Sequence, residues 1–254
     1  MKAYAVIPAR YGSTRLPGKL ILPEAKAITG KYLLEHVYSR VKEAKSIQGV
    51  IVATDDQRIF EVVRSFGGHV KMTSKGHISG TDRVAEVARG LDSEIIVNVQ
   101  GDEPDVRPEM IDAVVSTLQG DEEAVMATLA NPISSQDELY NPNAVKVVMD
   151  NRGYALYFSR SPIPYSPHSQ GPLEDQRFYR HLGIYSYRRD FLLRYSSLPP
   201  SRLEELERLE QLRALSNGYK IKVAVTPHQC YGVDTDEDFR RFLEKFSKKE
   251  AKKG

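Results

Sequence analysis

The chain has few of the features that mark extracellular, membrane-spanning or nucleic-acid-binding proteins. Its one cysteine, Cys230, excludes a disulfide within the chain and any metal cluster held by several cysteines of one chain. No apolar run approaches the roughly 18 residues that a membrane-spanning helix needs, and the apolar stretch at the start is too short for a signal peptide. A formal net charge of +2 is too small to indicate a nucleic-acid-binding surface. We therefore expect a cytoplasmic protein with no membrane segment and no nucleic-acid partner.

The composition is that of an ordinary globular protein. Hydrophobic residues make up 41% of the 254-residue chain and charged residues 28%. A chain of this length can bury a substantial core, either as one large α/β domain or as one domain with an elaborated lobe.

The first part of the chain alternates short apolar runs with amphipathic stretches. The apolar runs at residues 3–7, 49–54 and 94–100 predict strands, and the last is apolar on both faces, as in a central parallel strand. Helical spacing of apolar residues predicts helices between them, at 31–45 and 81–91. This alternation predicts right-handed crossovers and a doubly wound, mostly parallel sheet of the α/β class.

The pattern changes in the second half of the chain. Strand-like runs without regular helices between them occur at residues 124–130, 144–149, 154–159 and 180–187. Residues 159–172 contain too much proline for a helix or a central strand. We expect one domain over residues 1–254, with a strand-rich lobe inserted at about 130–200. Because this lobe uses many β-branched residues outside the main sheet, we expect it to form a homodimer.

A basic loop follows the first predicted strand. Residues 7–19 read I-P-A-R-Y-G-S-T-R-L-P-G-K and place Arg10, Arg15 and Lys19 around a glycine- and proline-containing turn. At the carboxyl end of a strand in a doubly wound sheet, such a loop can bind a polyphosphate through backbone N–H groups and cations. It is not a Walker loop, because its glycines are one residue too far apart. A solvated surface loop is the alternative, and the position in the fold favours phosphate binding.

Two aspartates that are far apart in the sequence follow predicted strands. Asp102 lies in N-V-Q-G-D-E-P, and Asp234 lies in G-V-D, after a strand predicted at 219–226. Because Mg²⁺ is typically held by one or two carboxylates plus substrate phosphates, the pair can be a magnesium site. Each aspartate can instead cap a turn or helix, which is the role we expect for Asp55 and Asp56.

Two further motifs place polar side chains where a ligand can reach them. In R-H-L-G-I-Y-S-Y, strand alternation puts His181 and Tyr185 on one face, suited to a hydroxylated ligand, although a lone histidine is usually structural. Glu210 falls within the apolar stripe of a helix predicted from about residue 200, and the stripe consists of Leu203, Leu206, Leu209 and Leu212. A buried carboxylate is costly unless it is paired, here with Arg213, or lines a cleft.

Taken in order, the motifs resemble those of the 3-deoxy-manno-octulosonate cytidylyltransferase family. The resemblance runs from about Lys2 to Phe242, on I-P-A-R-Y-x-S-T-R-L-P-G-K, V-A-T-D, S-G-T-D-R, I-V-N-V-Q-G-D-E-P, N-P-N-A-V-K-V-V, Y-A-L-Y-F-S-R, R-H-L-G-I-Y, L-E-Q-L-R and G-V-D-T. It implies a Rossmann-like nucleotidyltransferase sheet. It also implies an enzyme that uses Mg²⁺, usually as a dimer, to transfer CMP from CTP to the sugar acid, releasing pyrophosphate, for lipopolysaccharide assembly.

The resemblance also implies roles for individual residues. It implies nucleotide binding for Arg10, Ser13, Arg15, Lys19, Ser74, Gly80, Arg83 and Gln100. It implies sugar-acid binding for Arg160, His181, Tyr185, Glu210 and Gln211. Asp102 and Asp234 would hold magnesium and, with Lys19 and Arg15, form the catalytic set. The chain departs from the family at Gly12, where relatives often have alanine, and at residues 165–177, which match poorly.

These assignments imply direct nucleotidyl transfer. The anomeric hydroxyl would attack the α-phosphorus of CTP in line, while Lys19 and the arginines stabilise the triphosphate charge. One Mg²⁺ ion would lie between the two aspartates and a second on the phosphates. Three alternatives stay open: a nucleotidyltransferase for a sugar phosphate or a nonulosonic acid, a metal-dependent glycosyltransferase, and a non-catalytic nucleotide sensor. Against the glycosyltransferase, the chain has D-E-P-D in place of the usual Asp-x-Asp pair.

Overall fold

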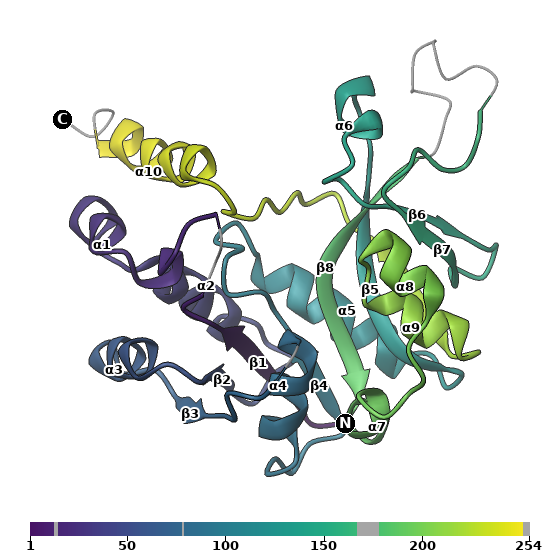
Figure 1. Ribbon diagram of the computed structural model, residues 1–254, viewed down its shortest axis with the longest axis horizontal. Coiled ribbons are helices and arrows are strands. Elements are labelled where there is room, and N and C mark those ends of the chain that lie inside the picture. The colour runs from purple at the N-terminus through teal and green to yellow at the C-terminus, as the bar shows by residue number, and fades with distance from the viewer. Residues whose placement is uncertain (13–14, 78, 167–177, 251–254) are drawn as a thin grey trace.

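The strands form one mixed sheet. A computed structural model describes residues 1–12, 15–77, 79–166 and 178–250 (Figure 1). Within this part of the chain, nine strands belong to the sheet, and its main path runs β3-β2-β1-β4-β8-β5-β9. The strands on this path are β1 (Ala3–Ala9), β2 (Val50–Thr54), β3 (Val70–Met72), β4 (Ile95–Asn98), β5 (Ala124–Pro132), β8 (Tyr179–Arg188) and β9 (Lys220–Val225).

Strand direction divides the sheet into two parts. Strands β1 to β4 are parallel to one another, so their carboxyl ends meet at one edge. Strand β8 runs antiparallel to both of its neighbours, β4 and β5, and β9 is parallel to β5. The predicted α/β class and the doubly wound, mostly parallel sheet are confirmed.

Helices cover both faces of the sheet. They are α1 (Pro23–Thr29), α2 (Leu33–Lys42), α3 (Gln57–Ser65), α4 (Gly80–Ala88), α5 (Pro108–Gln119), α6 (Gln136–Tyr140), α7 (Arg189–Tyr195), α8 (Arg202–Glu207), α9 (Gln211–Ser216) and α10 (Asp236–Glu250), with a 3-10 turn, η1 (Lys19–Ile21). In the part of the chain that the structure describes, none of them has the length and apolarity required to cross a bilayer.

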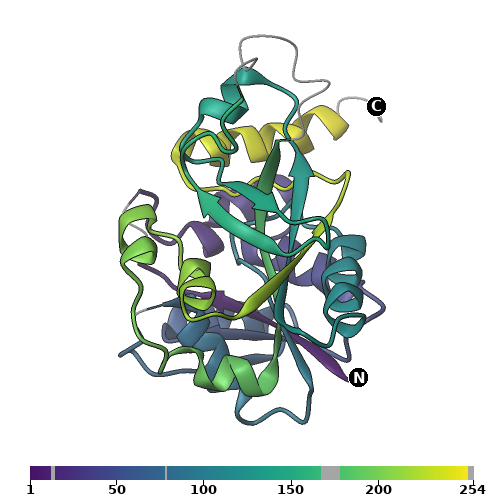
Figure 2. The same cartoon turned by 90° about the vertical axis from the view of Figure 1, so that its right-hand side faces the viewer.

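Alternate residues of the central strands point into two separate cores. Ile7 and Val97 pack on one face with side chains of α2, α5 and α10. Val6 and Ile96 pack on the other face with side chains of α4, α7 and α9. Figure 2 shows α5 and α9 on opposite sides of the sheet. The period of two along each strand therefore sorts the apolar side chains between the two layers of helices.

The remaining strands form a hairpin that extends from the main sheet. Strand β6 (Lys146–Met149) pairs antiparallel with β7 (Ala155–Ser159) and with the start of β8. In Figure 1 this hairpin lies to the right of the upper ends of β5 and β8, and α6 lies above them. Strand β8 lies within the range of the predicted lobe, yet it also pairs with β4 of the main sheet. The lobe and its boundaries at about 130–200 stay a prediction.

The single helix predicted from about residue 200 is wrong. The chain forms two short helices, α8 and α9, because Arg208 adopts a left-handed conformation with φ 53° between them. The predicted apolar stripe is broken at that point: Leu203 and Leu206 are 42% and 70% exposed, whereas Leu209 and Leu212 are buried. A helical wheel assumes a straight helix, so a left-handed residue at its centre invalidates the assignment of faces.

Candidate active site

The basic loop after β1 is closed on itself. The N–H of Gly18 donates to the carbonyl of Tyr11 at 3.0 Å, and the Arg58 guanidinium stacks on the Tyr11 ring at 3.3 Å. Gly18 has φ 70°, and a Cβ there would lie 3.0 Å from the same ring. Glycine is therefore required at this position. The turn begins η1 and directs Lys19 toward the sheet edge.

Lys19 joins two carboxylates that are distant in sequence. Its Nζ donates to Asp102 Oδ2 at 2.6 Å, to Asp234 Oδ1 at 2.9 Å and to the carbonyl of Val233 at 2.8 Å. The Lys19 side chain is only 10% exposed. Arg15 adds a second cation, 3.3 Å from Asp234 Oδ2. The structure thus brings all four members of the predicted catalytic set together.

The alternative in which Asp234 only caps a helix is not supported. The segment before α10 is capped by Thr235 and Asp238 instead. The Asp238 N–H donates to Thr235 Oγ1 at 3.1 Å, and the Thr235 N–H donates to Asp238 Oδ2 at 3.0 Å. This reciprocal pair is a capping box. The side chain of Asp234 is consequently left to contact Lys19 and Arg15.

The carboxylate pair suits magnesium on chemical grounds. Oxygens of Asp102 and Asp234 converge on one ammonium, so both lie within reach of a single cation. Among the described residues, no group of three or more histidine, cysteine or acidic side chains could hold a metal by itself. Mg²⁺ commonly binds one or two carboxylates and completes its shell with water and substrate phosphates. The donor set fits Mg²⁺ that arrives with a triphosphate.

The predicted nucleotide-binding residues lie along the edge formed by the carboxyl ends of the parallel strands. Arg10 follows β1 and is exposed, Ser74 follows β3, and Gln100 follows β4. Gly80 begins α4 beside Pro8, whose Cγ lies 3.5 Å from the position of an added Cβ. Ser13 lies outside the described residues. This edge is where doubly wound sheets bind ligands.

Arg83 supports this edge through protein contacts. Its Nη1 donates to Thr73 Oγ1 at 2.6 Å, and its Nη2 donates to Asp55 Oδ2 at 3.0 Å. The expectation that Asp55 is a helix cap is therefore wrong, since its carboxylate pairs with an arginine from another helix. Asp56 is the cap of α3, accepting from the N–H of Arg58 at 2.9 Å.

The predicted sugar-binding residues of β8 share one face, as expected. The rings of His181 and Tyr185 are tilted to each other with centroids 5.3 Å apart, and the ring of Phe158 of β7 packs edgewise on His181 at 4.9 Å. Leu182 and Ile184 point into the opposite core. Burial lowers the pKa of His181 to about 3, so the imidazole is neutral at physiological pH.

A β-bulge shapes this face. The pairing of β5 with β8 slips between Thr128 and Leu129 of β5. The hydroxyl of Thr128 lies 2.8 Å from the carbonyl of Ile184 and 3.0 Å from His181 Nε2. Bulges often redirect side chains beside active sites. Here the bulge fixes the orientation of His181 through the same hydroxyl that bonds the displaced backbone.

Glu210 and Gln211 begin α9 against the start of α4. Side-chain hydrogen bonds join the Glu210 carboxyl to Thr81 and Ser79, and burial raises its pKa. Pairing with Arg213 does not account for the buried Glu210, because Arg213 forms a bidentate pair with Glu204, with hydrogen bonds of 2.7 and 2.8 Å. Gln211 is 5% exposed, and its Nε2 has no hydrogen-bond partner within the described ranges. An unsatisfied buried amide is costly, which favours a ligand as its partner.

Arg160 is held beside these helices. Its backbone N–H donates to Glu207 Oε2 at 2.9 Å, and its Nε donates to the Glu207 carbonyl at 2.8 Å. Its Nη1 donates to the carbonyl of Pro142 at 2.9 Å. Glu207 ends α8, three residues before Glu210, so Arg160 lies near the break between α8 and α9.

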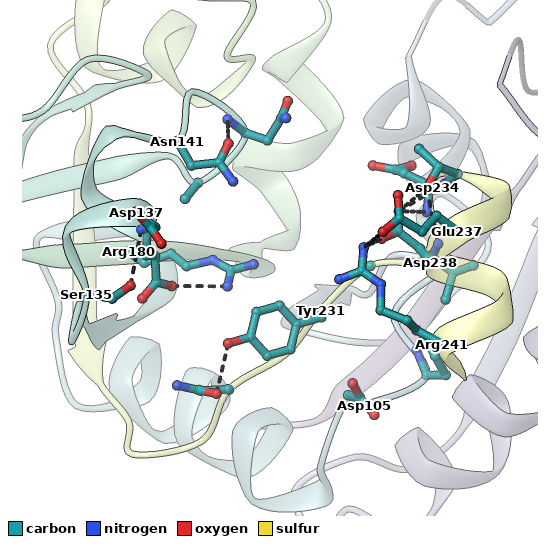
Figure 3. A pocket seen from close by; sticks show the side chains of 18 of the residues that line it. Asp105, Ser135, Asp137, Asn141, Arg180, Tyr231, Asp234, Glu237, Asp238 and Arg241 are labelled. Carbon is teal, nitrogen blue, oxygen red and sulfur yellow. Dashed lines mark hydrogen bonds and ion pairs between the residues drawn. The ribbon is translucent and has the colours of Figure 1, made fainter. Parts of the chain in front are cut away.

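A cavity of about 840 Å³ opens between the residues around α6 and the start of α10 (Figure 3). Asp234 and Arg15 line one side of it, and Arg180 and Asn141 line the other. Tyr231 lies between the two sides, with the Arg180 guanidinium over its ring at 4.6 Å. The cavity therefore reaches Asp234, one of the two carboxylates that contact Lys19. Its described lining does not include the predicted sugar-binding residues, so it is not the pocket that those residues would form.

Glu103 was not among the predicted site residues, although it directly follows Asp102. Its Oε2 lies 3.6 Å from Cys230 Sγ, and its Oε1 would lie 3.5 Å from a Cβ at Gly183. Burial, with the nearby charge of Asp102, raises the pKa of Glu103 to about 7. The D-E pair in N-V-Q-G-D-E-P was the available signal, because both carboxylates follow a buried strand.

Asn98 and Thr81 were also missed. Both form side-chain hydrogen bonds with the hydroxyl of Tyr187 beneath α4. Asn98 is 2% exposed in an otherwise apolar strand, and that polar interruption was visible in the sequence as V-N-V. Thr81 is the second residue of α4, and its contact with Glu210 depends on a helix 130 residues later in the chain, which local patterns do not report.

Comparison with known proteins identifies the family. A family model described as cytidylyltransferase matches residues 4–221. The 3-deoxy-manno-octulosonate cytidylyltransferase of Geobacter sulfurreducens is 49% identical, over 96% of this chain and 99% of that protein. The corresponding protein of Syntrophotalea carbinolica is 51% identical, over 95% of this chain and 97% of that protein.

A solved structure agrees with these relatives. A CMP:2-keto-3-deoxy-manno-octonic acid synthetase, solved in complex with CTP, has a TM-score of 0.90 and 42% sequence identity. The match covers 98% of this chain and 100% of that one. Sequence and fold therefore agree over nearly the full length, and the chain belongs to the 3-deoxy-manno-octulosonate cytidylyltransferase family of nucleotidyltransferases.

Proposed function

We propose that this protein transfers CMP from CTP to 3-deoxy-manno-octulosonate, giving CMP-3-deoxy-manno-octulosonate and pyrophosphate for lipopolysaccharide biosynthesis. The names of relatives that are about half identical in sequence support this reaction. So does the CTP complex of the similar solved structure. The observation that carries the proposal is the convergence of Lys19, Asp102 and Asp234 at the ligand-binding edge of the sheet.

Lys19 and the arginines of the first loop act on the triphosphate. Arg10, Arg15 and Lys19 neutralise its charge and align the α-phosphorus with the acceptor, because positioning and electrostatics dominate phosphoryl transfer. The anomeric hydroxyl of the sugar acid gives its proton to solvent water, and its oxygen bonds to the α-phosphorus. The bond from that phosphorus to the bridging oxygen breaks, and pyrophosphate leaves with the electron pair.

Asp102 and Asp234 are the residues that would hold magnesium. When bound, Mg²⁺ supplies positive charge against the reacting phosphates. A second ion would bind to the phosphates of CTP. The nucleotide itself is assigned to Ser74, Gly80, Arg83 and Gln100, along the carboxyl ends of the parallel strands, and to Ser13, which lies outside the described residues.

The sugar acid is assigned to the face of β8 that α9 borders. Arg160 would pair with its carboxylate, because guanidinium groups recognise carboxylates through parallel hydrogen bonds. His181, Tyr185, Glu210 and Gln211 would bind its hydroxyl groups. The buried, unsatisfied Nε2 of Gln211 supports this part of the proposal.

We also propose that the protein works as a homodimer in the cytoplasm. Exposed leucines support the dimer: Leu156 of β7 is 62% exposed and Leu206 of α8 is 70% exposed. Hydrogen bonds from Ser159 and Tyr157 to Glu207 join these two elements. A pair of exposed apolar side chains on neighbouring elements suits a subunit interface. The cytoplasm is the compartment that supplies CTP.

Pyrophosphate release is the decisive assay. Purified protein with Mg²⁺ is tested against a panel of nucleoside triphosphates and acceptors, including 3-deoxy-manno-octulosonate, a nonulosonic acid and a sugar phosphate. We expect release only with CTP and 3-deoxy-manno-octulosonate. Preference for another acceptor would indicate a different sugar nucleotidyltransferase. If the protein binds CTP but releases no pyrophosphate with any acceptor, it is a nucleotide sensor. If it transfers the sugar from a nucleotide sugar instead, it is a glycosyltransferase.

A further inference from the structure

Lys146 is a buried cation outside the catalytic set. It is the first residue of β6 and is 0% exposed. In the sheet register it lies opposite Ser159 of β7 and Arg180 of β8, so it occupies the junction of three strands. Its motif, N-P-N-A-V-K-V-V, has no role in the reaction described so far.

The ammonium of Lys146 bonds three backbone carbonyls. Its Nζ donates to Asn141 at 2.9 Å, to Ala144 at 2.6 Å and to Arg160 at 2.6 Å. An ammonium has three N–H donors, so these bonds use all of them. Burying a charge is tolerated only when it is fully hydrogen-bonded, which makes the positions of the three carbonyls mutually dependent.

The turn at 141–144 and Arg160 are also joined by a hydrogen bond in which the arginine side chain is the donor. Arg160 Nη1 donates to the carbonyl of Pro142, within the turn whose carbonyls bind Lys146. Glu207 holds the other side of Arg160 through its carboxylate and its carbonyl. Without the ammonium, the turn at 141–144 and the Arg160 carbonyl would lose the donor that they share, while the bond from Arg160 Nη1 to Pro142 would remain. The anchored end of the guanidinium would then move with the turn.

We propose that Lys146 is a positioning residue for Arg160, and that it sets where this guanidinium meets the carboxylate of the sugar acid. The inference rests on the proposed function, because the contact between Arg160 and the sugar acid is part of it. Lys146 touches no substrate in this account and acts through the turn at 141–144 and the Arg160 backbone.

The test is a split between the two KM values, measured by pyrophosphate release with the full chain. Lys146→Met keeps the length of the side chain but removes all three donors. We expect it to raise the KM for 3-deoxy-manno-octulosonate by about tenfold or more, as for loss of a charge-assisted hydrogen bond. The KM for CTP and kcat should stay within about threefold. Lys146→Arg, which restores a cation with several donors, should recover part of the loss.

Two further variants separate positioning from general destabilisation. Val147→Ala removes buried volume from the next residue of β6, and it should lower Tm without changing the sugar-acid KM. Arg160→Lys should raise that KM, since it removes the planar pair of donors. If Lys146→Met does not fold, Lys146→Gln, which retains two N–H donors, should give the same split with a smaller rise.

The outcomes discriminate between the inference and the function. An unchanged sugar-acid KM in Lys146→Met, or an equal rise in Val147→Ala, would overturn the inference while leaving the reaction intact. An unchanged KM in Arg160→Lys would overturn the sugar-binding role of Arg160, and the inference with it. Wild-type protein that releases no pyrophosphate would overturn the proposed function itself.

Discussion

The ammonium of Lys19 lies 2.6 Å from the carboxylate of Asp102, although 83 residues separate them in the sequence. The contact follows from the pairing of two strands. Strands β1 and β4 are adjacent and parallel, so the loops that follow them emerge side by side. A cation on the first loop and an acid on the second therefore meet because their strands are neighbours in the sheet, although their motifs are far apart in the sequence. Asp234 joins them from the segment that precedes α10.

Removing Asp102 should separate binding from turnover. We expect Asp102→Ala to retain CTP binding, because the loop cations remain, and to lose about 10²–10³-fold in kcat, as when a charge-stabilising group is removed. Isothermal titration with CTP and pyrophosphate release measure the two effects. Asp105→Asn is the matched control, since Asp105 bonds the exposed Lys245 at 2.6 Å. Near-normal turnover in Asp102→Ala would contradict the metal assignment.

The Lys19 ammonium and Mg²⁺ should compete for the same carboxylates. In Lys19→Met the competing cation is gone, so we expect Mg²⁺ alone to bind about tenfold more tightly and to raise Tm more than in wild type. Turnover should still fall by about 10²–10³-fold, because Lys19 also acts on the triphosphate. Adding Asp234→Asn to this variant should abolish the extra Tm shift. Equal shifts in wild type and Lys19→Met would show that the ion binds elsewhere.

Two glycines of the first loop should respond differently to alanine. Gly18→Ala forces a left-handed conformation on a residue with a side chain and crowds Tyr11, so we expect a loss of about 1–2 kcal/mol in the free energy of unfolding. Its KM for CTP should rise as well. At Gly12 an added Cβ would meet no described atom within 4 Å, so Gly12→Ala should be tolerated. Denaturant unfolding and steady-state kinetics compare the pair.

Burial of His181 should make stability depend on pH. Its folded pKa, about 3, lies below the ordinary value of 6.5, so the unfolded chain binds the proton first as pH falls. The free energy of unfolding should therefore decrease by about 1.4 kcal/mol for each pH unit below about 6 through this group. Burial also lowers the pKa of His36, to about 4, so this residue likewise decreases the free energy of unfolding as pH falls.

A variant measures how much His181 contributes to the pH dependence of the free energy of unfolding. In His181→Asn the decrease in stability between pH 7 and pH 5 should be smaller than in wild type. Measurements at pH 8, where histidine is neutral in both states, give the packing cost of the substitution by itself. The same decrease in both proteins would contradict the assignment. Urea unfolding at each pH provides the data.

The exposed leucines of β7 and α8, Leu156 and Leu206, should lie at the subunit interface. We expect wild-type protein to have twice the mass of one 28.7 kDa chain in solution, and Leu206→Asp to shift it to the mass of a single chain. Ile28→Asp, on α1 and not on β7 or α8, is the control and should leave the dimer intact. Light scattering after size-exclusion chromatography measures both. A monomeric wild type at micromolar concentration would remove the dimer proposal.

Much of the fold was predictable from the sequence because periodicity reports burial directly. The apolar run at residues 94–100 predicted β4 in the centre of the sheet, and both faces of that strand are buried. The helix after residue 200 was not predictable in the same way. A single left-handed residue, Arg208, divides it, and the two halves keep helical composition on both sides of the break.

The site was predictable in part. Lys19, Asp102 and Asp234 carried motif signals, and the structure brings them together. The contacts of Asp55 with Arg83, and of Glu210 with Ser79 and Thr81, depend on how separate helices pack against the sheet edge. Local composition does not encode that geometry, so these partners could be found only from the fold.

The pairing of β5 with β8 determines what an exchange of the segment between these strands would change. The chain leaves the main sheet after Pro132 and returns at Tyr179, and these two residues are register partners in adjacent strands. The two ends of the intervening segment therefore lie side by side in adjacent strands of the main sheet. Exchanging it would leave the parallel strands and their phosphate loop untouched. Of the five residues assigned to the sugar acid, Arg160 alone lies within this segment, so an exchange would change that contact while His181, Tyr185, Glu210 and Gln211 stay in place.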